Sequence, residues 1–274
     1  MLALSEISAV PVSYLFVPGS RPERFDKAMA AGADVVIIDL EDAVSPLDKD
    51  SARAAVAAWL SADKPICLRI NSTDTDWFAS DLTLCAHAGV AAVMLPKAAQ
   101  VADIERVRQA GARRVLPLIE SAQGFVNLSA IAAAEGVERL AFGSIDFAVD
   151  LGIEGDEREL DYFRSQLVLA SRVAGIAAPI DGVTTAIDDK RVLESETLRG
   201  KHFGFGGKLC IHPAQLGVVH AGYLPQAAEV DWAERVLAAA AGSKGAAVAV
   251  DGKMVDRPVI LKAERILARA GRSS

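Results

Sequence analysis

The sequence predicts an α/β protein, a (β/α)8 TIM barrel with a C-terminal helical extension. Short apolar runs alternate with helix-like segments along most of the 274 residues. Nearly continuous apolar runs are typical of parallel strands buried on both faces, and each intervening helix supplies the crossover that parallel pairing needs. The length also suits a single large barrel domain. An open, doubly wound sheet is the alternative arrangement of the same elements.

Eight apolar segments are the expected strands, and the segments between them have small and apolar residues at helical spacing. The expected strands are 12–17, 33–40, 66–70, 91–96, 113–120, 138–143, 177–181 and 207–211. The expected helices are 22–31, 48–60, 76–88, 100–110, one ending at Ala134, and 157–174.

The pattern changes after about Pro225, where a helix near 226–241 is followed by a glycine-rich stretch. The pair Asp251–Gly252 predicts a tight turn. Pro258 fits the first turn of a final basic helix. We therefore assign residues 1–224 to the barrel with the active site, and 225–274 to an extension that packs on its own barrel or on a neighbouring subunit.

Composition limits the classes of function. The net charge of -7 argues against a general nucleic-acid surface, which is usually basic. No apolar run reaches the roughly 18 to 20 residues that span a bilayer, and the start MLALSEISAVPV has no signal-peptide pattern. The three cysteines form no CxxC pair, so neither a zinc site nor a disulfide scaffold is indicated. We expect a cytoplasmic enzyme that binds neither nucleic acid nor membrane.

Three of the apolar runs each end in one charged residue: Arg69, Glu120 and Asp146. In a barrel of this kind, the active site gathers at the C-terminal ends of the strands. Oxygen ligands without a Cys or His cluster favour a hard cation such as magnesium, which commonly takes one or two protein carboxylates. Glu120 and Asp146 would fill those two positions, and Arg69 would bind an anionic substrate.

Asp39, Glu41 and Asp42 lie at the C-terminal end of another predicted strand, and they can hold metal-coordinated waters. An ordinary interpretation stands beside each of these assignments. Glu120 and Asp146 can lie in the first turn or cap of the next helix, where negative charge is favourable. The strand-end arginine can be a plain ion-pair partner.

A second group of residues suits a phosphate. Arg21 and Arg24 follow a strand and a Pro-Gly turn, and Lys208 lies in a glycine-rich stretch. Backbone donors and fixed positive charge together make a plausible anion site. The alternative is a plain loop with solvated arginines, and neither stretch matches a nucleotide-binding fingerprint.

Several of these segments together resemble the HpcH/HpaI aldolase superfamily, in its citrate lyase β-subunit-like branch. The matching stretches are LFVPGSRPERFDKA, DVVIIDLEDAVSPLDKDSAR, ICLRIN, VMLPKA, LPLIESAQG, LAFGSIDFAVDLG, GKLCIHPAQ and DGKMVDRPVILKAERIL. The resemblance implies a (β/α)8 barrel that binds Mg²⁺ and an acyl-CoA and forms homotrimers or larger homo-oligomers.

The resemblance also implies roles for individual residues. Glu120 and Asp146 match the metal ligands, with Glu120 also contacting the substrate, and Arg69 matches the arginine that binds the substrate carboxylate. Glu41 and Asp42 match the acidic pair that orders metal-bound water. Arg21, Arg24 and Lys208 are the candidates to bind the CoA phosphates.

Asp256 matches an aspartate that, in citramalyl-CoA and malyl-CoA lyases, reaches a neighbouring subunit's site; it is our candidate for proton transfer. Its alternative role is an N-cap just before Pro258. The pyruvate-type aldolases of the superfamily use a histidine after the second strand, whereas this chain reads DLEDAV there. That departure favours the CoA-thioester branch.

The expected activity is magnesium-dependent cleavage of citramalyl-, malyl- or citryl-CoA to acetyl-CoA and a 2-oxo acid. Four alternatives remain open. They are a malyl-CoA thioesterase, a citrate lyase β subunit acting on a carrier-protein thioester, a metal-dependent aldolase without CoA, and a non-enzymatic binding subunit.

Overall fold

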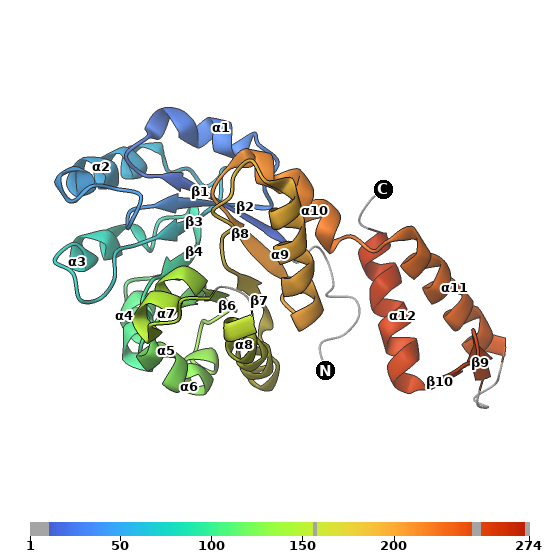
Figure 1. Ribbon diagram of the computed structural model, residues 1–274. Helices are drawn as coiled ribbons and strands as arrows, with labels where there is room; N and C mark the ends of the chain where they lie inside the picture. The colour runs from blue at the N-terminus through green and yellow to red at the C-terminus, as the bar shows by residue number, and fades with distance from the viewer. Residues whose placement is uncertain (1–10, 156–157, 243–247, 272–274) are drawn as a thin grey trace. The chain divides into compact units, whose positions relative to one another are not determined.

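A computed structural model describes residues 11–155, 158–242 and 248–271 of the chain. Eight parallel strands form a closed barrel in sequence order, surrounded by helices (Figure 1). They are β1 (Ser13–Pro18), β2 (Val35–Asp39), β3 (Ile66–Arg69), β4 (Val90–Leu95), β5 (Val115–Ile119), β6 (Arg139–Phe142), β7 (Ala177–Asp181) and β8 (Gly207–Cys210). Pairing of Ser13 with Lys208 joins β8 to β1 and closes the ring, which confirms the barrel and excludes the open sheet.

The helices lie in the connections between strands. The α-helices up to residue 223 are α1 (Phe25–Met29), α2 (Lys49–Trp59), α3 (Phe78–Asp81), α4 (Val101–Gln109), α5 (Ala122–Val126), α6 (Leu128–Ala132), α7 (Ser144–Leu151), α8 (Asp161–Ala174), α9 (Lys190–Phe203) and α10 (Leu216–Tyr223). The 3-10 turns are η2 (Pro22–Arg24), η3 (Pro46–Asp48), η4 (Leu82–Leu84), η5 (Arg158–Leu160) and η6 (Pro213–Gln215). None of the helices in the described part of the chain is long and apolar enough to cross a membrane.

The interior of the barrel is a packed apolar core to which every strand contributes. Its buried members are Tyr14, Ile37, Cys67, Met94, Leu116, Leu118, Ala141, Ile180 and Leu209. Because side chains fill the interior, the barrel has no open pore, and an active site is expected at the C-terminal ends of its strands. Burial raises the pKa of the Cys210 thiol to about 11, which disfavours the reactive thiolate.

One element differs from the sequence prediction. The strand expected over 138–143 is β6, which ends at Phe142, but the residues from Ser144 onward, interpreted as part of the apolar run up to Asp146, form the helix α7. Gly143 breaks the strand, and α7 has an acidic first turn and ends at Gly152 in the left-handed conformation. Asp146 therefore lies in the first turn of a helix, one of the two positions that the sequence left open.

The contacts of the chain separate two compact units, residues 11–220 and a second unit from Ala221 onward, so that α10 crosses the border. In the second unit, α11 (Ala227–Gly242) packs against α12 (Arg257–Ala270). Strands β9 (Val248–Val250) and β10 (Lys253–Val255) form an antiparallel hairpin. Asp251 and Gly252 join them with φ of 52° and 73°, the tight turn expected from their sequence.

Candidate active site

A cavity of about 70 Å³ opens at the C-terminal mouth of the barrel. Its lining residues are Phe16, Arg69, Leu118, Glu120, Phe142, Gly143, Ser144, Ile145, Asp146, Val183 and Leu209. The structure thus brings together the three charged residues that the sequence placed at separate strand ends.

Arg69 is fixed at this mouth by a buried carboxylate. Asp39 and Arg69 are direct neighbours in the register of β2 and β3. Nε and one Nη of the guanidinium donate to the two Asp39 oxygens, both at 2.7 Å. Asp39 also accepts from the backbone N–H groups of Glu41 and Ala43. Because such a bidentate pair fixes the plane of the guanidinium, the remaining N–H donors face a defined direction.

Glu41 lies next to the same guanidinium, but its carboxylate has fewer hydrogen bonds than that of Asp39. Its Oε2 is 2.9 Å from Nη1 of Arg69, yet the groups are not aligned for a hydrogen bond, and this buried oxygen has no hydrogen-bond partner in the described part of the chain. Burial, which the charge of Arg69 opposes, raises the pKa of Glu41 to about 7. Asp42 is exposed and lies 3.7 Å from Arg69. Of the predicted acidic pair, only Glu41 is buried at the site.

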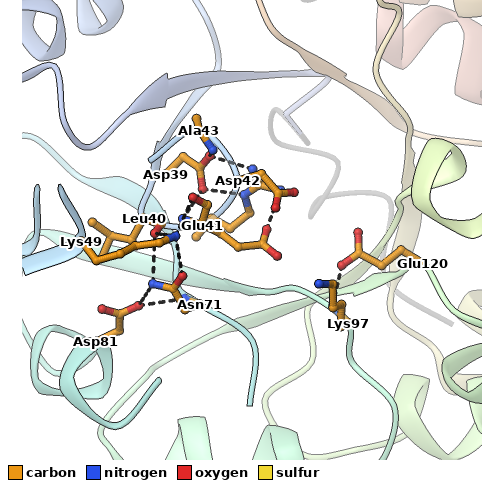
Figure 2. Close-up of polar contacts among 11 residues, drawn as sticks. Asp39, Leu40, Glu41, Asp42, Ala43, Lys49, Asn71, Asp81, Lys97 and Glu120 are labelled. Atoms are coloured by element: carbon orange, nitrogen blue, oxygen red, sulfur yellow. Dashed lines mark hydrogen bonds and ion pairs between the residues drawn. The ribbon is translucent and has the colours of Figure 1, made fainter. Parts of the chain in front are cut away.

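Glu120 follows β5 and is almost fully buried. Its Oε1 accepts a 2.6 Å hydrogen bond from the backbone N–H of Lys97 (Figure 2). Lys97 has a φ of 48°, the left-handed region that costs a residue with a Cβ about 1 kcal/mol or more. Burial and the nearby charge of Glu41 raise the pKa of Glu120 to about 8. Both effects disfavour the charged form of this carboxyl group when no cation is bound.

The glycine that ends β6 makes room for this carboxylate. A Cβ on Gly143 would lie 2.5 Å from Oε2 and 2.6 Å from Cβ of Glu120. Contacts this short force a displacement, so only glycine allows β6 to approach Glu120 this closely.

Replacing Gly143 with alanine is expected to displace the Glu120 carboxylate. We expect a loss of about 1–3 kcal/mol in the free energy of unfolding from overpacking, together with a loss of metal-dependent activity. Gly217→Ala is the matched control, because a Cβ at Gly217 meets nothing within 4 Å. Thermal melts and Mg²⁺ titration of both variants test this expectation, and a Gly143→Ala protein that binds Mg²⁺ normally contradicts it.

These carboxylates fit a magnesium ion. Within the described ranges, no three His, Cys, Asp or Glu side chains gather into a metal site by themselves. Magnesium does not require one, because it usually keeps several waters and takes one or two carboxylates. Glu120 and Asp146 line the cavity, and the unpartnered oxygen of Glu41 can accept from an ordered water. A bound cation would also favour the charged form of Glu120, whose pKa is raised by burial and by the charge of Glu41.

The two arginines expected to bind phosphates lie just beyond the C-terminal end of β1. Their side chains are about half exposed, and each forms an ion pair with Glu23, at 2.7 Å for Arg21 and 3.9 Å for Arg24. Exposed pairs of this kind are weak, so both guanidinium groups can turn to an anion.

Lys208 requires a correction. It lies within β8 and is 2% exposed, and its ammonium donates to the carbonyl of Gly182 at 2.9 Å and approaches Glu196 at 3.5 Å. An ammonium engaged in this way inside the fold is not available to a CoA phosphate. The expected strand 207–211 is present as β8, and its burial is what withdraws the Lys208 ammonium from solvent.

Asp256 lies in the second unit and caps α12. Its Oδ1 accepts from the backbone N–H of Val259 at 3.2 Å, and Pro258 occupies the first turn. The capping role that the sequence offered as an alternative is therefore present. One carboxylate oxygen serves it, and the side chain is exposed.

Sequence reasoning missed several polar residues at this mouth. Asn71 and Lys97 each follow a strand by two residues, which was a usable signal for a position at the mouth. Lys49 and Asp81 lie on helices, where nothing in their spacing marks them as part of the site. Gly143 was hidden inside a run interpreted as strand.

The chain is similar to known proteins in both sequence and structure. The HpcH/HpaI aldolase/citrate lyase family model matches residues 12–213, and a model for C–C bond lyases of the TIM-barrel fold matches 160–272. The chain is 38% identical to a citrate lyase subunit beta-like protein of Mycobacterium tuberculosis, over 98% of each chain. It is 37% identical to a (3S)-malyl-CoA thioesterase of Cereibacter sphaeroides, over 94% of each.

A crystal structure of protein CitE from M. tuberculosis in complex with magnesium, acetoacetate and coenzyme A is also similar. The TM-score is 0.87 at 38% identity, covering 97% of this chain and 99% of that chain. The similarity therefore extends over both compact units of the chain.

Proposed function

The chain belongs to the HpcH/HpaI aldolase/citrate lyase family, and we propose that it is a magnesium-dependent carbon–carbon lyase acting on a 3-hydroxy-dicarboxylyl- or tricarboxylyl-CoA. Its products would be acetyl-CoA and a 2-oxo acid. The observation that supports this is the joint position of Arg69, Glu120 and Asp146 around one cavity. A guanidinium and two carboxylates there match the substrate's carboxylate and a hard metal ion.

Each residue would have a distinct task. Arg69, fixed by Asp39, would bind the substrate carboxylate and neutralise its charge. Glu120 and Asp146 would hold magnesium, whose charge polarises the substrate oxygens when it is bound. Glu41 and Asp42 would order water at the site. Loss of the hydroxyl proton to a base allows the carbon–carbon bond to break, and the electron pair leaves with the acyl-CoA as an enolate.

Asp256 would complete the reaction by transferring a proton to the enolate carbon, which yields acetyl-CoA. The exposed guanidinium groups of Arg21 and Arg24 would bind CoA phosphates. We extend the proposal to assembly as a homotrimer or a larger homo-oligomer, in which Asp256 can serve its own or a neighbouring subunit's site.

The Asp256→Asn variant separates the capping role of this aspartate from its proposed role in proton transfer. Asn is as good an N-cap as Asp but transfers no proton, so Asp256→Asn should keep the melting temperature and lose roughly 10²- to 10⁴-fold in kcat. Asp256→Ala should lose the cap as well, about 1 kcal/mol. Full activity in Asp256→Asn would leave capping as its sole role. Partial recovery of activity on mixing Asp256→Asn with Glu120→Gln protein would place Asp256 in a neighbouring subunit's site.

The test of the proposed function is a cleavage assay on citryl-, citramalyl- and malyl-CoA, with and without Mg²⁺. The expected result is acetyl-CoA plus the 2-oxo acid from at least one thioester, abolished by EDTA. The free hydroxy acids, offered without CoA, should be inert; their cleavage would indicate an aldolase that does not use CoA.

A thioesterase is the second candidate, and the similarity to the (3S)-malyl-CoA thioesterase favours it. The same assay separates the two activities. Free CoA with intact hydroxy acid indicates hydrolysis, whereas acetyl-CoA with a 2-oxo acid indicates carbon–carbon cleavage. Measuring the free thiol and the 2-oxo acid in the same sample decides between them.

A further inference from the structure

A buried lysine lies directly beneath the acidic segment after β2. Lys49 is the first residue of α2, and it is 5% exposed. Its ammonium donates to the carbonyls of Leu40 and Glu41, both at 2.8 Å, and to Oδ1 of Asn71 at 2.7 Å (Figure 2). An ammonium has three N–H donors, so all of them are used within the protein. Lys49 therefore has no donor left for a ligand.

Asn71 connects this lysine to a second buried charge. Its side-chain N–H groups donate to the carbonyl of Leu40 at 3.0 Å and to Asp81 at 2.6 Å, and its backbone N–H donates to the same Asp81 oxygen. Asp81 is fully buried and also accepts from Nε of Arg53 at 2.7 Å. The network thus runs from α2 and α3 to two successive carbonyls of the segment that follows β2.

Those two carbonyls belong to the residues that present the Glu41 carboxylate. Asp39 has four hydrogen bonds that hold it, two of them from Arg69. Glu41 has no comparable side-chain support, because its Oε2 has no hydrogen-bond partner among the described residues. The position of its carboxylate beside Arg69 therefore depends on the backbone that carries it. The Lys49 ammonium holds the two carbonyls of this backbone, and Asp39 accepts from the N–H groups of Glu41 and Ala43.

We propose that Lys49, with Asn71 and Asp81 behind it, is a positioning residue that fixes the Glu41 carboxylate against Arg69 at the mouth of the barrel. The inference rests on the proposed function for its kinetic consequence. It assigns Lys49 no contact with substrate or metal. Its effect passes entirely through the Leu40–Glu41 backbone.

The test is the Lys49→Met variant, which keeps the length of the side chain and removes its three donors. Mutating a residue that holds a functional side chain in place typically lowers activity by about 10- to 100-fold. We therefore expect kcat to fall by roughly 10- to 100-fold. KM should change by less than about threefold, because Asp39 still holds the arginine that binds the substrate carboxylate. Asn71→Ala is the milder second variant and should show a smaller loss of the same kind.

Arg139→Met is the matched control for the loss of a buried cation. Arg139 is also fully buried and donates to backbone carbonyls, those of Ala178 and Pro11, both at 2.7 Å. It begins β6 and so lies at the opposite end of the barrel. Its variant should lose stability with an unchanged kcat per folded molecule. An equal loss of kcat in both variants would overturn the inference.

A double-mutant cycle with Glu41→Gln tests the route of the effect. If Lys49 acts through Glu41, Lys49→Met should cost little further kcat in the Glu41→Gln background. If Lys49→Met lowers kcat in the Glu41→Gln background as much as it does in the wild-type protein, the inference is overturned.

A crystal structure of Lys49→Met tests the positioning without any activity. The Glu41 carboxylate should leave Nη1 of Arg69, now 2.9 Å away, while the 2.7 Å Asp39–Arg69 contacts persist. An unmoved Glu41 overturns the inference. Failure of the wild-type protein to cleave any of the thioesters would contradict the proposed function alone, and this structure would still decide the role of Lys49.

Discussion

Glu120→Gln is expected to abolish magnesium-dependent cleavage, with kcat lowered by on the order of 10²–10³-fold or more. The substitution keeps the size of the side chain and an oxygen that can accept from the Lys97 N–H, now at 2.6 Å. It removes the negative charge that would hold the metal. Because burial and neighbouring charge raise the pKa of Glu120 to about 8, removing this charge should not destabilise the metal-free protein.

Thermal melts measure this effect separately from catalysis. A ligand that binds only the native state stabilises it by mass action, so Mg²⁺ should raise the melting temperature of the wild-type protein. Glu120→Gln should melt at or above the metal-free wild-type temperature and show little further rise with Mg²⁺. Glu135→Gln is the control, because it makes the same change on a side chain that is 90% exposed. A Glu120→Gln protein with wild-type activity and a wild-type Mg²⁺ response would exclude the proposed metal site.

The barrel and the position of Arg69 could be predicted because they depend on patterns that are local in sequence. Continuous apolar runs identify parallel strands, and a charge at the end of such a run must lie near the mouth. The register then pairs Asp39 with Arg69, two residues that the sequence had already placed at strand ends. The bidentate ion pair between them follows from that register, which the sequence alone does not specify.

Asp146 shows where this reasoning fails. The sequence placed the end of the strand at Gly143, but the apolar run continues beyond it, so the helix that begins at Ser144 was not visible in the hydrophobic pattern. The residue still lines the cavity, because the first turn of α7 begins at the mouth. A residue at the end of β6 and a residue in the first turn of α7 would both lie at the mouth. The wrong secondary structure for Asp146 therefore still gave the right location for its carboxylate.

The network beneath Glu41 could not be predicted from the sequence. Lys49 and Asp81 are 32 residues apart, and the Asn71 side chain forms hydrogen bonds to both. A lysine at the start of a helix usually suggests a solvent-exposed position, and only the packing of α2 and α3 against the barrel buries its ammonium. Lys97 is similar, since neither its left-handed conformation nor the hydrogen bond from its N–H to Glu120 has a signal in the sequence pattern.

Arg69→Leu is expected to cost both stability and activity. Asp39 is fully buried, and removing its partner leaves an uncompensated buried charge, so the free energy of unfolding should fall by about 3–5 kcal/mol. The stacking of the guanidinium over Phe16, 4.7 Å from the ring centroid, is lost as well. Cleavage should fall by on the order of 10³-fold, because the substrate carboxylate loses its counter-charge. Denaturant unfolding and steady-state kinetics measure the two effects.

Adding Asp39→Asn to Arg69→Leu separates the two losses. The second substitution removes the stranded buried charge, so most of the lost stability should return while activity stays absent. Arg114→Leu is the control for an exposed pair, since Arg114 lies 3.3 Å from Glu138 with a side chain 63% exposed, and it should cost less than about 1 kcal/mol. If Arg69→Leu costs no more than Arg114→Leu, Asp39 is not a buried counter-ion. If Asp39→Asn restores activity together with stability, Arg69 acts on the fold and not on the substrate.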